Sequence, residues 1–463
     1  MGLLWRGSRV VDPANGRDEV CDLLIEDGRI ADVGQELESS SHRVIDLAGL
    51  VTIPGVVDCH VHVTNWLGGP QGYRMMARAG TVTAIDMAGP FDELVANAPG
   101  LATGLNVGGL ESIRPGQNVR SDDPSRDEIR RLVRESQASG ALGIKILGGH
   151  FPLTPEATSR AIQVANEEDA YVAFHVGTTS WPRSDLRSFK QAVELAGTNR
   201  VHICHVCTCC LGLVLGDPIA ELSEMLAILE KRPNVSSESH LSITAYSFAQ
   251  IEDGRPLSLS TRMFLEIGGY QADTDGVKRA LSDGYACVVV PGILENSLAF
   301  REQAASEWEA GQVRALGFRA NLPVSLLTCA LHKGGDGSFV VDALATDGGG
   351  IPRNNLLRSG SLLVRLGAMT LSDLATKISL APARMFGLSS KGHLSVGADA
   401  DVSAFDPMTG EAVFTLARGR PVLENSEPVG SGFQLISTER IDPEHGLEGT
   451  TMSSGFGSIK ASQ

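Results

Sequence analysis

Residues 54–62 read PGVVDCHVH, an apolar segment in which His60 and His62 stand two positions apart. Side chains at positions i and i+2 of a β-strand point to the same face, so both imidazoles can bind one metal ion together. Imidazole suits zinc, iron, nickel and similar ions. The alternative is two polar residues on a half-buried strand, but burying them without a ligand would cost free energy. We interpret the pair as part of a metal site.

Lys145 interrupts an apolar segment, GIKIL at residues 143–147. A lysine is rarely buried without a specific role. Burial could deprotonate the amine, which would then combine with carbon dioxide to give an anionic carbamate able to bridge two cations. The alternative is a lysine whose ammonium group extends to solvent at the end of a barrel strand.

Three more candidates stand at the ends of apolar segments. His175 follows Phe174, His205 lies in VHICHV at 201–206, and Asp347 precedes three glycines. Each could be a metal ligand, and Asp347 could also act as a base. Taken singly, each histidine is more often a core or surface residue, and Asp347 is equally well explained as a helix cap or turn residue.

The spacing of the candidates decides between these interpretations. His62 and Lys145 lie 83 positions apart, close to three strand-plus-helix units of about 28 residues, and Lys145, His175 and His205 follow at intervals of 30. Equal spacing places each candidate at the same level of successive strands, as barrel active sites require. His205 and Asp347 lie 142 positions apart, which predicts an insertion of about 80 residues, around Glu295–Leu316, that forms a lid or part of the substrate pocket.

The elements that must position these residues alternate between short apolar strands and helices. This alternation predicts an α/β fold, a (β/α)₈ TIM barrel. Helical spacing covers Arg126–Ala138, Pro155–Glu168 and Ser188–Ala196. The eight predicted strands are Gly55–Val63, Thr81–Met87, Ala102–Leu110, Gly143–Leu147, Tyr171–Val176, Val201–Val206, Ala286–Pro291 and Ala343–Asp347.

Both ends of the chain read as short strands with turns, such as the hairpin around Glu26-Asp27-Gly28. Neither end alone has enough strands for a stable sheet, so we expect the two ends to pair. The predicted organisation is a small β-sandwich domain from residues 1–52 and 395–430, the barrel from 53–394, and an extended or partly disordered C-terminal tail from 431–463.

Composition narrows the classes of partner. The chain is 42% hydrophobic and 20% charged, ordinary values for a globular protein, with a formal net charge of −16. An acidic surface repels phosphate backbones, so nucleic acid is not expected as a partner. No apolar run reaches the roughly 18 residues that span a bilayer, and the N-terminus turns polar too soon for a signal peptide. We therefore expect no membrane contact and a cytoplasmic location.

Four of the eight cysteines fall within seven residues, at Cys204, Cys207, Cys209 and Cys210. This is not a spaced disulfide framework. The cluster could bind a soft metal, but so short a segment cannot easily supply a tetrahedral site alone. We favour small thiols packed behind the sixth strand.

The ordered set of candidates resembles the amidohydrolase superfamily. Residues 54–62 resemble its first-strand signature, and residues 379–388 and 391–401 resemble its exit into the β-domain, so the resemblance covers about residues 5–425. A lysine on the fourth strand resembles the binuclear, carboxylated-lysine branch, which includes hydantoinases, dihydropyrimidinases, dihydroorotases, allantoinases and the urease catalytic chain.

The resemblance implies two divalent metal ions, expected to be Zn²⁺, with Mn, Fe, Co or Ni as alternatives. It implies a buried ion, an exposed ion and a carbamate on Lys145 that bridges them. His202 is the alternative ligand from the sixth strand, but the motif alignment favours His205. The implied ligands of the buried ion are His60, His62 and Asp347, and those of the exposed ion are His175 and His205.

The implied chemistry is attack on a carbonyl by a hydroxide that bridges the metal ions. Asp347 would take the proton and pass it to the leaving nitrogen. His150, His240 or Tyr246 would donate to the oxyanion, and the sequence does not choose among them. Arg353 could bind a substrate carboxylate, with a structural arginine as the alternative.

The resulting hypothesis is a metal-dependent hydrolase that cleaves a C–N bond of a cyclic amide, imide or ureide, as hydantoinases and dihydroorotases do. One alternative is deacylation of an N-acyl amino acid or hydrolysis of a linear amide or urea. Another is deamination of a heterocycle, although mononuclear deaminases need no bridging carbamate. A barrel serving only as a scaffold would need none of the six candidate ligands. The expected partner is a small-molecule substrate, and such barrels are often homo-oligomers.

Overall fold

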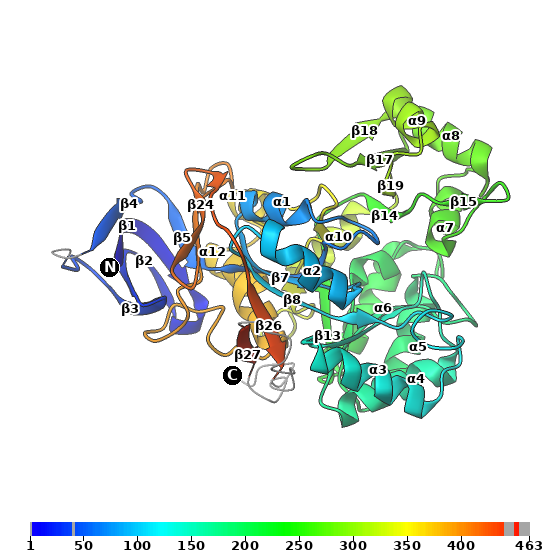
Figure 1. Ribbon diagram of the computed structural model, residues 1–463, viewed down its shortest axis with the longest axis horizontal. Helices are drawn as coiled ribbons and strands as arrows, with labels where there is room; N and C mark the ends of the chain where they lie inside the picture. The colour runs from blue at the N-terminus through cyan, green and yellow to red at the C-terminus, as the bar shows by residue number, and fades with distance from the viewer. Residues whose placement is uncertain (1, 39–41, 439–448, 453–463) are drawn as a thin grey trace.

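A computed structural model of the chain describes residues 2–38, 42–438 and 449–452. A sheet built from both ends of the chain lies at one end of the molecule, and a lobe drawn in green projects from the other end (Figure 1). The candidate site residues belong to the strands between them, so these strands are described first.

Successive parallel pairings link the strands of the central part of the molecule. β6 pairs β7, β7 pairs β8, β9 pairs β10, and the pairing continues through β11, β12 and β13 to β20, while β21 pairs β6. Only Leu110 separates β8 from β9, and only Ala345–Asp347 separates β20 from β21. The bounds are β6 Val56–His62, β7 Thr81–Asp86, β8 Asn106–Gly109, β9 Glu111–Ser112, β10 Gly143–Leu147, β11 Tyr171–His175, β12 Val201–Ile203, β13 Val235–Ser239, β20 Ala343–Leu344 and β21 Gly348–Gly349.

Helices alternate with these strands, and local signals fix several of their starts. A capping box of Ser125 and Glu128 begins α3, and the Thr154 side chain accepts from the Ala157 amide at the start of α4. The helices are α1 Gly72–Arg78, α2 Phe91–Leu101, α3 Arg126–Ala138, α4 Pro155–Glu167, α5 Leu186–Ala196, α6 Pro218–Glu230, α10 Pro323–Leu331, α11 Leu356–Arg365, α12 Leu371–Ala375 and α13 Ala381–Met385. The short η2 spans Val206–Cys209 and the π-helix η3 spans Thr376–Leu380.

The seventh predicted strand is wrong. Val235–Ser239 forms β13, which pairs β12 on one side and β20 on the other. Its sequence, VSSES, is too polar to be recognised as a buried strand, although all five residues are buried. Ala286–Val290 instead forms β17, the apolar centre of a separate antiparallel sheet.

That separate sheet belongs to the lobe inserted between β13 and α10 (Figure 1). Its strands follow the order β14-β19-β17-β18, and it has its own apolar core, which includes Phe264, Leu281 and Phe318. The lobe spans residues 245–318, close to the predicted size of about 80 residues, but it begins well before the predicted segment around Glu295–Leu316. Its elements are β14 Ala245–Phe248, β15 Ile251–Glu252, β16 Arg255–Pro256, α7 Leu259–Ile267, α8 Thr274–Ser282, β17 Ala286–Val290, β18 Ser297–Phe300, α9 Arg301–Glu309 and β19 Ala315–Phe318.

The two ends of the chain meet in one nine-stranded sheet. β5 runs antiparallel to β22, with Pro54 opposite Val402 and Val51 opposite Phe405. Trp5, Leu23 and Val402 belong to the apolar core of this sheet. Its strands are β1 Leu3–Asp12, β2 Arg17–Glu26, β3 Arg29–Gly34, β4 Arg43–Asp46, β5 Val51–Pro54, β22 Val402–Phe405, β23 Ala412–Ala417, β24 Arg420–Glu424 and β25 Glu427–Pro428, and η1 (Pro13–Asn15) joins β1 to β2.

Part of the expected C-terminal tail is a strand. β26 (Gln434–Thr438) lies parallel to β8 and buries Leu435 and Ile436, and β27 (Gly449–Met452) pairs β26 in turn. The other tail residues from 439 on lie outside the described residues. Among the helices that the structure describes, none combines the length and apolar character needed to cross a bilayer.

Candidate metal centre

All six predicted metal ligands line one cavity. Its free volume is about 30 Å³, room for only one or two water molecules. The ligands come from strands far apart in the sequence. Most of them lie at or just beyond the end of a strand, whereas Lys145 lies in the middle of β10. His60 and His62 belong to β6 and His175 to β11, His205 follows β12, and Asp347 lies between β20 and β21.

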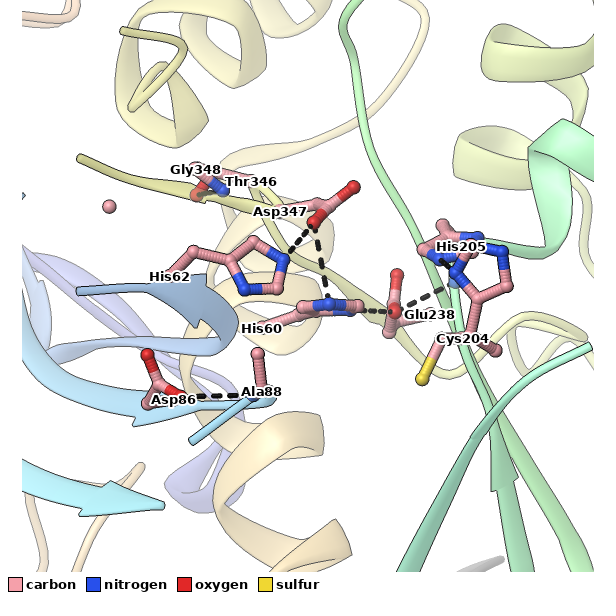
Figure 2. Close-up of polar contacts among 12 residues, drawn as sticks. His60, His62, Asp86, Ala88, Cys204, His205, Glu238, Thr346, Asp347 and Gly348 are labelled. Carbon is pink, nitrogen blue, oxygen red and sulfur yellow. Dashed lines mark hydrogen bonds and ion pairs between the residues drawn. The ribbon is translucent and has the colours of Figure 1, made fainter. Parts of the chain in front are cut away.

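His60, His62 and Asp347 form the tightest group. The Oδ1 atom of Asp347 lies 2.8 Å from Nε2 of His62 and 3.4 Å from Nε2 of His60 (Figure 2). The ligand atoms of the three residues lie within 4.8 Å of one another. Each can therefore offer an atom to the same small volume.

His175 and His205 form the second pair. Their nearest ring nitrogens, Nδ1 of His175 and Nε2 of His205, lie 3.1 Å apart. Ser184 contacts Nε2 of His175 at 3.1 Å, and Thr208 contacts Nδ1 of His205 at 3.2 Å. His202, the alternative, is not on the cavity wall, because its Nδ1 atom contacts the Tyr171 hydroxyl at 2.9 Å.

The backbone adopts unusual conformations at two of these positions. His205 has a φ of 34° and Asp347 a φ of 50°, both in the left-handed region that non-glycine residues rarely adopt. Such conformations cost on the order of 1–3 kcal/mol each and gather at functional sites. The surrounding structure therefore holds both side chains at some expense to stability.

Lys145 is buried, with 1% of its surface exposed, and its Nζ atom lies 2.7 Å from Sγ of Cys204. It forms no ion pair with a carboxylate in the described part of the chain. Cys204 therefore does not pack behind the sixth strand as expected. Cys207, Cys209 and Cys210 do, in an apolar cluster that also contains Cys329.

Burial favours the neutral form of five histidines around the cavity. It lowers the pKa of His205 to about 4 and the pKa of His150 and His240 to about 3, and it lowers the pKa of His60 and His175 well below the usual value. Neutral imidazole is the form that binds a metal ion.

Asp347 is the charged member of the group. Burial alone would raise its pKa, but Arg353, His60 and His62 together hold the pKa well below its usual value. Arg353 forms an ion pair with Oδ2 of Asp347 and donates from Nε to the Asp347 carbonyl at 2.7 Å and from Nη1 to the Thr244 carbonyl at 2.9 Å. All three guanidinium nitrogens are thus engaged, which leaves little capacity for the substrate carboxylate predicted from the sequence.

The predicted oxyanion donors lie around this centre. His150 and Tyr246 line the same cavity as the six ligands, and His240 and Tyr246 line an adjoining cavity that shares His175, His205 and Asp347. The inserted lobe contributes Tyr246 to both cavities. It therefore forms part of the pocket wall, one of the two roles expected of the insertion.

Tyr246 and Arg353 also line a larger groove of about 850 Å³ between the inserted lobe, α1 and the start of α11. The guanidinium carbon of Arg353 lies 4.9 Å from the centre of the Tyr246 ring, a cation–π contact. These two residues are shared by the groove and both small cavities. They stand between the spacious groove and the cavity of the six ligands.

Glu238 belongs to this centre but is not among the site residues predicted from the sequence. It lies on β13, is fully buried, and its Oε1 atom contacts Nδ1 of His60 and the amide of His205, each at 2.7 Å. Burial raises its pKa to about 8. The only feature of the sequence that could indicate its role is that Glu238 directly follows the short segment Val235-Ser236-Ser237.

The residues present fit a metal ion. The donors are imidazoles and a carboxylate, the ligands that zinc and related ions take in catalytic sites. Nδ1 of His62 and Oε2 of Glu238 are buried without a hydrogen-bond partner among the described residues. Buried polar atoms are rarely left unpaired in this way.

Two proteins of known function are similar to this chain over most of its length. The chain is 25% identical to one component of the formyltransferase/hydrolase complex Fhc of Methylorubrum extorquens, over 96% of this chain and 92% of that protein. It is 21% identical to the dihydroorotase of Geobacter metallireducens, over 88% of this chain and 90% of that enzyme.

Among solved structures, the N-acyl-D-glutamate deacylase of Bordetella bronchiseptica, complexed with zinc and a phosphonate inhibitor, matches with a TM-score of 0.68. The identity is 16%, and the match covers 94% of this chain and 98% of that one. At this identity the likeness is one of fold.

A model of the amidohydrolase family matches residues 51–207 and 318–429, more than half of the chain. The unmatched interval, 208–317, contains β13 and nearly the whole inserted lobe. The matched residues carry all of the predicted ligands. The chain belongs to the amidohydrolase family.

Proposed function

We propose that this protein is a metal-dependent hydrolase that cleaves a C–N bond of a cyclic amide, imide or ureide. The observation that carries the proposal is that His60, His62, Lys145, His175, His205 and Asp347 line one cavity although they span nearly 290 positions of the sequence. The similarity to a dihydroorotase over most of the chain supports the cyclic substrate class.

Two metal ions would be held by these side chains. His60, His62 and Asp347 would hold the first, and His175 and His205 the second. Lys145 fits a bridging role once carboxylated. Its buried amine has no ion-pair partner among the described residues, and the carbamate would put an anion there that faces several imidazoles. Bound ions would supply hydroxide near neutral pH and polarise the substrate carbonyl.

The protein's own groups would manage the proton. Asp347 is ionised, because its pKa is held low, and it stands beside both histidines of β6, so it can accept the proton of the attacking nucleophile and deliver it to the leaving nitrogen. Arg353 would orient Asp347 through its contacts to both the side chain and the carbonyl.

Tyr246, His150 and His240 are the candidates for donating to the substrate oxygen as negative charge develops on it. Burial raises the pKa of Tyr246 well above its usual value and lowers the pKa of both histidines, so all three remain neutral near pH 7 and can each donate one proton. Tyr246 lines both small cavities, which favours it.

The ring of paired strands supports a (β/α)₈ TIM barrel, and we propose the domain organisation expected from the sequence: a β-sandwich domain from residues 1–52 and 395–430, and the hydrolase barrel from 53–394. The segment 431–463 is not wholly a tail, because β26 extends the sheet of β6, β7 and β8. Zinc as the metal, two ions per chain, a homo-oligomer and a cytoplasmic location stay predictions.

A second candidate is hydrolysis of a linear amide, including an N-acyl amino acid. The similarity to the Fhc component over nearly the whole chain and the fold shared with an N-acyl-D-glutamate deacylase favour it. The groove beyond Tyr246 and Arg353 would also accommodate a longer substrate. Deamination of a heterocycle is the third candidate and is less well supported, because it gives Lys145 no role.

One panel of assays separates these candidates. Zinc-loaded protein would be tested on hydantoins, dihydropyrimidines, lactams, N-acyl amino acids and aminated heterocycles. Ring opening in the first three groups supports the proposal, acid release from the fourth supports the second candidate, and ammonia release from the last supports deamination. Lys145→Ala should lose metal and activity, and short carboxylic acids should restore part of both. Full activity in that variant would rule out the bridging role.

A further inference from the structure

The buried carboxylate of Glu238 touches both halves of the candidate centre. Its Oε1 atom lies 2.7 Å from Nδ1 of His60, which belongs to the first group of ligands. The same atom accepts a hydrogen bond of 2.7 Å from the amide of His205, which belongs to the second. Figure 2 shows Glu238 between the two histidines. None of the six predicted ligands comes from β13, so this strand adds a contact that the ligand set does not include.

The two nitrogens of His60 face different partners. Nε2 points to Oδ1 of Asp347 at 3.4 Å, on the side where His62 also lies, while Nδ1 faces Glu238. A neutral imidazole carries one proton. If Nδ1 donates that proton to Glu238, the lone pair of Nε2 is left for the metal ion. Carboxylates that hold the second nitrogen of a metal-bound histidine in this way fix both its tautomer and its ring orientation.

The contact to His205 acts on the backbone. His205 stands in the left-handed region, with a φ of 34°, directly after β12 ends. The Oε1 atom can accept this hydrogen bond whether the carboxyl group is protonated or ionised, and the bond is stronger when the group is ionised. Glu238 therefore stabilises the turn that directs the His205 imidazole into the cavity.

We propose that Glu238 is a positioning residue that sets the His60 tautomer and the His205 turn together, and so couples the two metal positions. This inference rests on the proposed function, since it assumes that His60 and His205 bind metal. Glu238 does not need to touch the substrate or either ion to act in this way.

The test measures metal binding rather than turnover. Metal-free wild-type protein, Glu238→Gln and Glu238→Met would be titrated with Zn²⁺ against a chelating indicator, and the visible absorption of their Co²⁺ forms would be recorded. Methionine fills the space of glutamate but accepts no strong hydrogen bond, and glutamine keeps the oxygen without the charge. We expect Zn²⁺ affinity to fall about 10–100-fold in the methionine variant and less in the glutamine variant, with altered Co²⁺ absorption in both.

Glu221→Gln is the matched control. Glu221 is also fully buried and also accepts backbone amides, from Gly212, Val214 and Leu215, but it lies on α6 and outside the cavity of the six ligands. Its variant should keep wild-type affinity and absorption, which separates a role at the centre from general damage to the core.

Wild-type Zn²⁺ affinity and Co²⁺ absorption in Glu238→Met would overturn the inference. If that variant does not fold by circular dichroism, Glu238→Gln decides, and unchanged values there overturn it equally. A wild-type protein that binds no metal would instead defeat the proposed function. A wild-type protein that binds metal and hydrolyses amides, beside an unaffected Glu238→Gln, would defeat this inference alone.

Discussion

Nε2 of His62 lies 2.8 Å from Oδ1 of Asp347, although 285 positions separate the two residues in the sequence. The contact joins the end of β6, where the succession of parallel strands begins, to the residue just before β21, which pairs β6. The centre therefore forms only when all of these strands have paired. A substitution at one ligand should also affect the other ligands.

Asp347→Asn tests the proton carrier. The amide is nearly the same size but cannot accept and hold a proton, so kcat should fall by about 10²–10⁴-fold, the range that general acid–base groups contribute. Steady-state assays on the best substrate of the panel would measure it. Activity within a few-fold of wild type would show that another group moves the proton.

Arg353→Gln distinguishes orientation of Asp347 from binding of a substrate carboxylate. Because all three guanidinium nitrogens contact Asp347 or Thr244, we expect kcat to fall about 10–100-fold while KM changes little. A large rise in KM with kcat unchanged would favour the carboxylate-binding role instead. Arg9→Gln, at an exposed position paired with Asp18 in the sheet of the chain ends, is the control and should leave both constants unchanged.

Tyr246 gives separate predictions for its ring and its hydroxyl. Tyr246→Phe keeps the ring beneath Arg353 and removes the hydroxyl, so a loss of about 10²-fold in kcat is expected if the hydroxyl donates to the oxyanion. Tyr246→Ala also opens the wall between the groove and the small cavities, and should broaden the range of substrate sizes. Wild-type kcat in the phenylalanine variant would assign the oxyanion to His150 or His240.

Lys377 predicts a specific dependence of stability on pH. It is fully buried on η3, where its Nζ atom bonds the Val341 carbonyl, and burial lowers its pKa from 10.5 to about 8. Between these two values the unfolded chain holds one more proton than the folded chain. This group therefore makes the free energy of unfolding rise with pH by about 1.4 kcal/mol per pH unit.

The Lys377→Met variant lacks that titration. The difference in unfolding free energy, wild type minus variant, should therefore increase as the pH is raised from 8 to 10.5, and should be constant below about pH 7. Urea unfolding at a series of pH values would measure it. A difference that does not change with pH would contradict the prediction.

Lys391 stabilises the sheet formed by both chain ends. Its buried Nζ atom lies 2.9 Å from Asp399 and 2.7 Å from Asp401, and Asp401 also accepts a hydrogen bond from Asn106 of β8. Lys391→Met removes the cation that Asp401 contacts, while Asp399 keeps Arg29 and Arg418, so a loss of about 3–5 kcal/mol in unfolding free energy is expected. Metal content of the folded fraction should be unchanged. A loss below about 1 kcal/mol would show that Arg29 and Arg418 compensate.

The strands that carry the ligands could be predicted well because each of them coincides with an apolar segment of the sequence. Gly143–Leu147 coincides with β10, and Tyr171–Val176 exceeds β11 by one residue. The spacing of Lys145, His175 and His205 correctly placed them on or beside successive strands. The expectation that they lie at the same level was wrong, because Lys145 pairs with Ala173, two residues before His175. The helices Arg126–Ala138 and Pro155–Glu168 were predictable for a similar reason, since caps and apolar periodicity are local signals.

The seventh strand could not be found in this way. Serine and glutamate on β13 are buried only because neighbouring strands and His60 surround them, and that is a tertiary fact. The apolar β17 was chosen in its place because a strand buried in an inserted lobe has the same local pattern as a barrel strand. Because β13 was not predicted, the role of Glu238 on this strand was not predicted either. The ion pair between Arg353 and Asp347 also could not be predicted from the sequence.

Counting the metal ions bound to the folded protein is the most direct test of the proposed two-metal centre. Protein prepared with bicarbonate and Zn²⁺, then freed of excess metal, would be analysed by elemental mass spectrometry for the wild type and for His60→Asn/His62→Asn. We expect about two ions per wild-type chain and at most one in the double variant. Equal metal content in the two proteins, or no metal in the wild type, would contradict it.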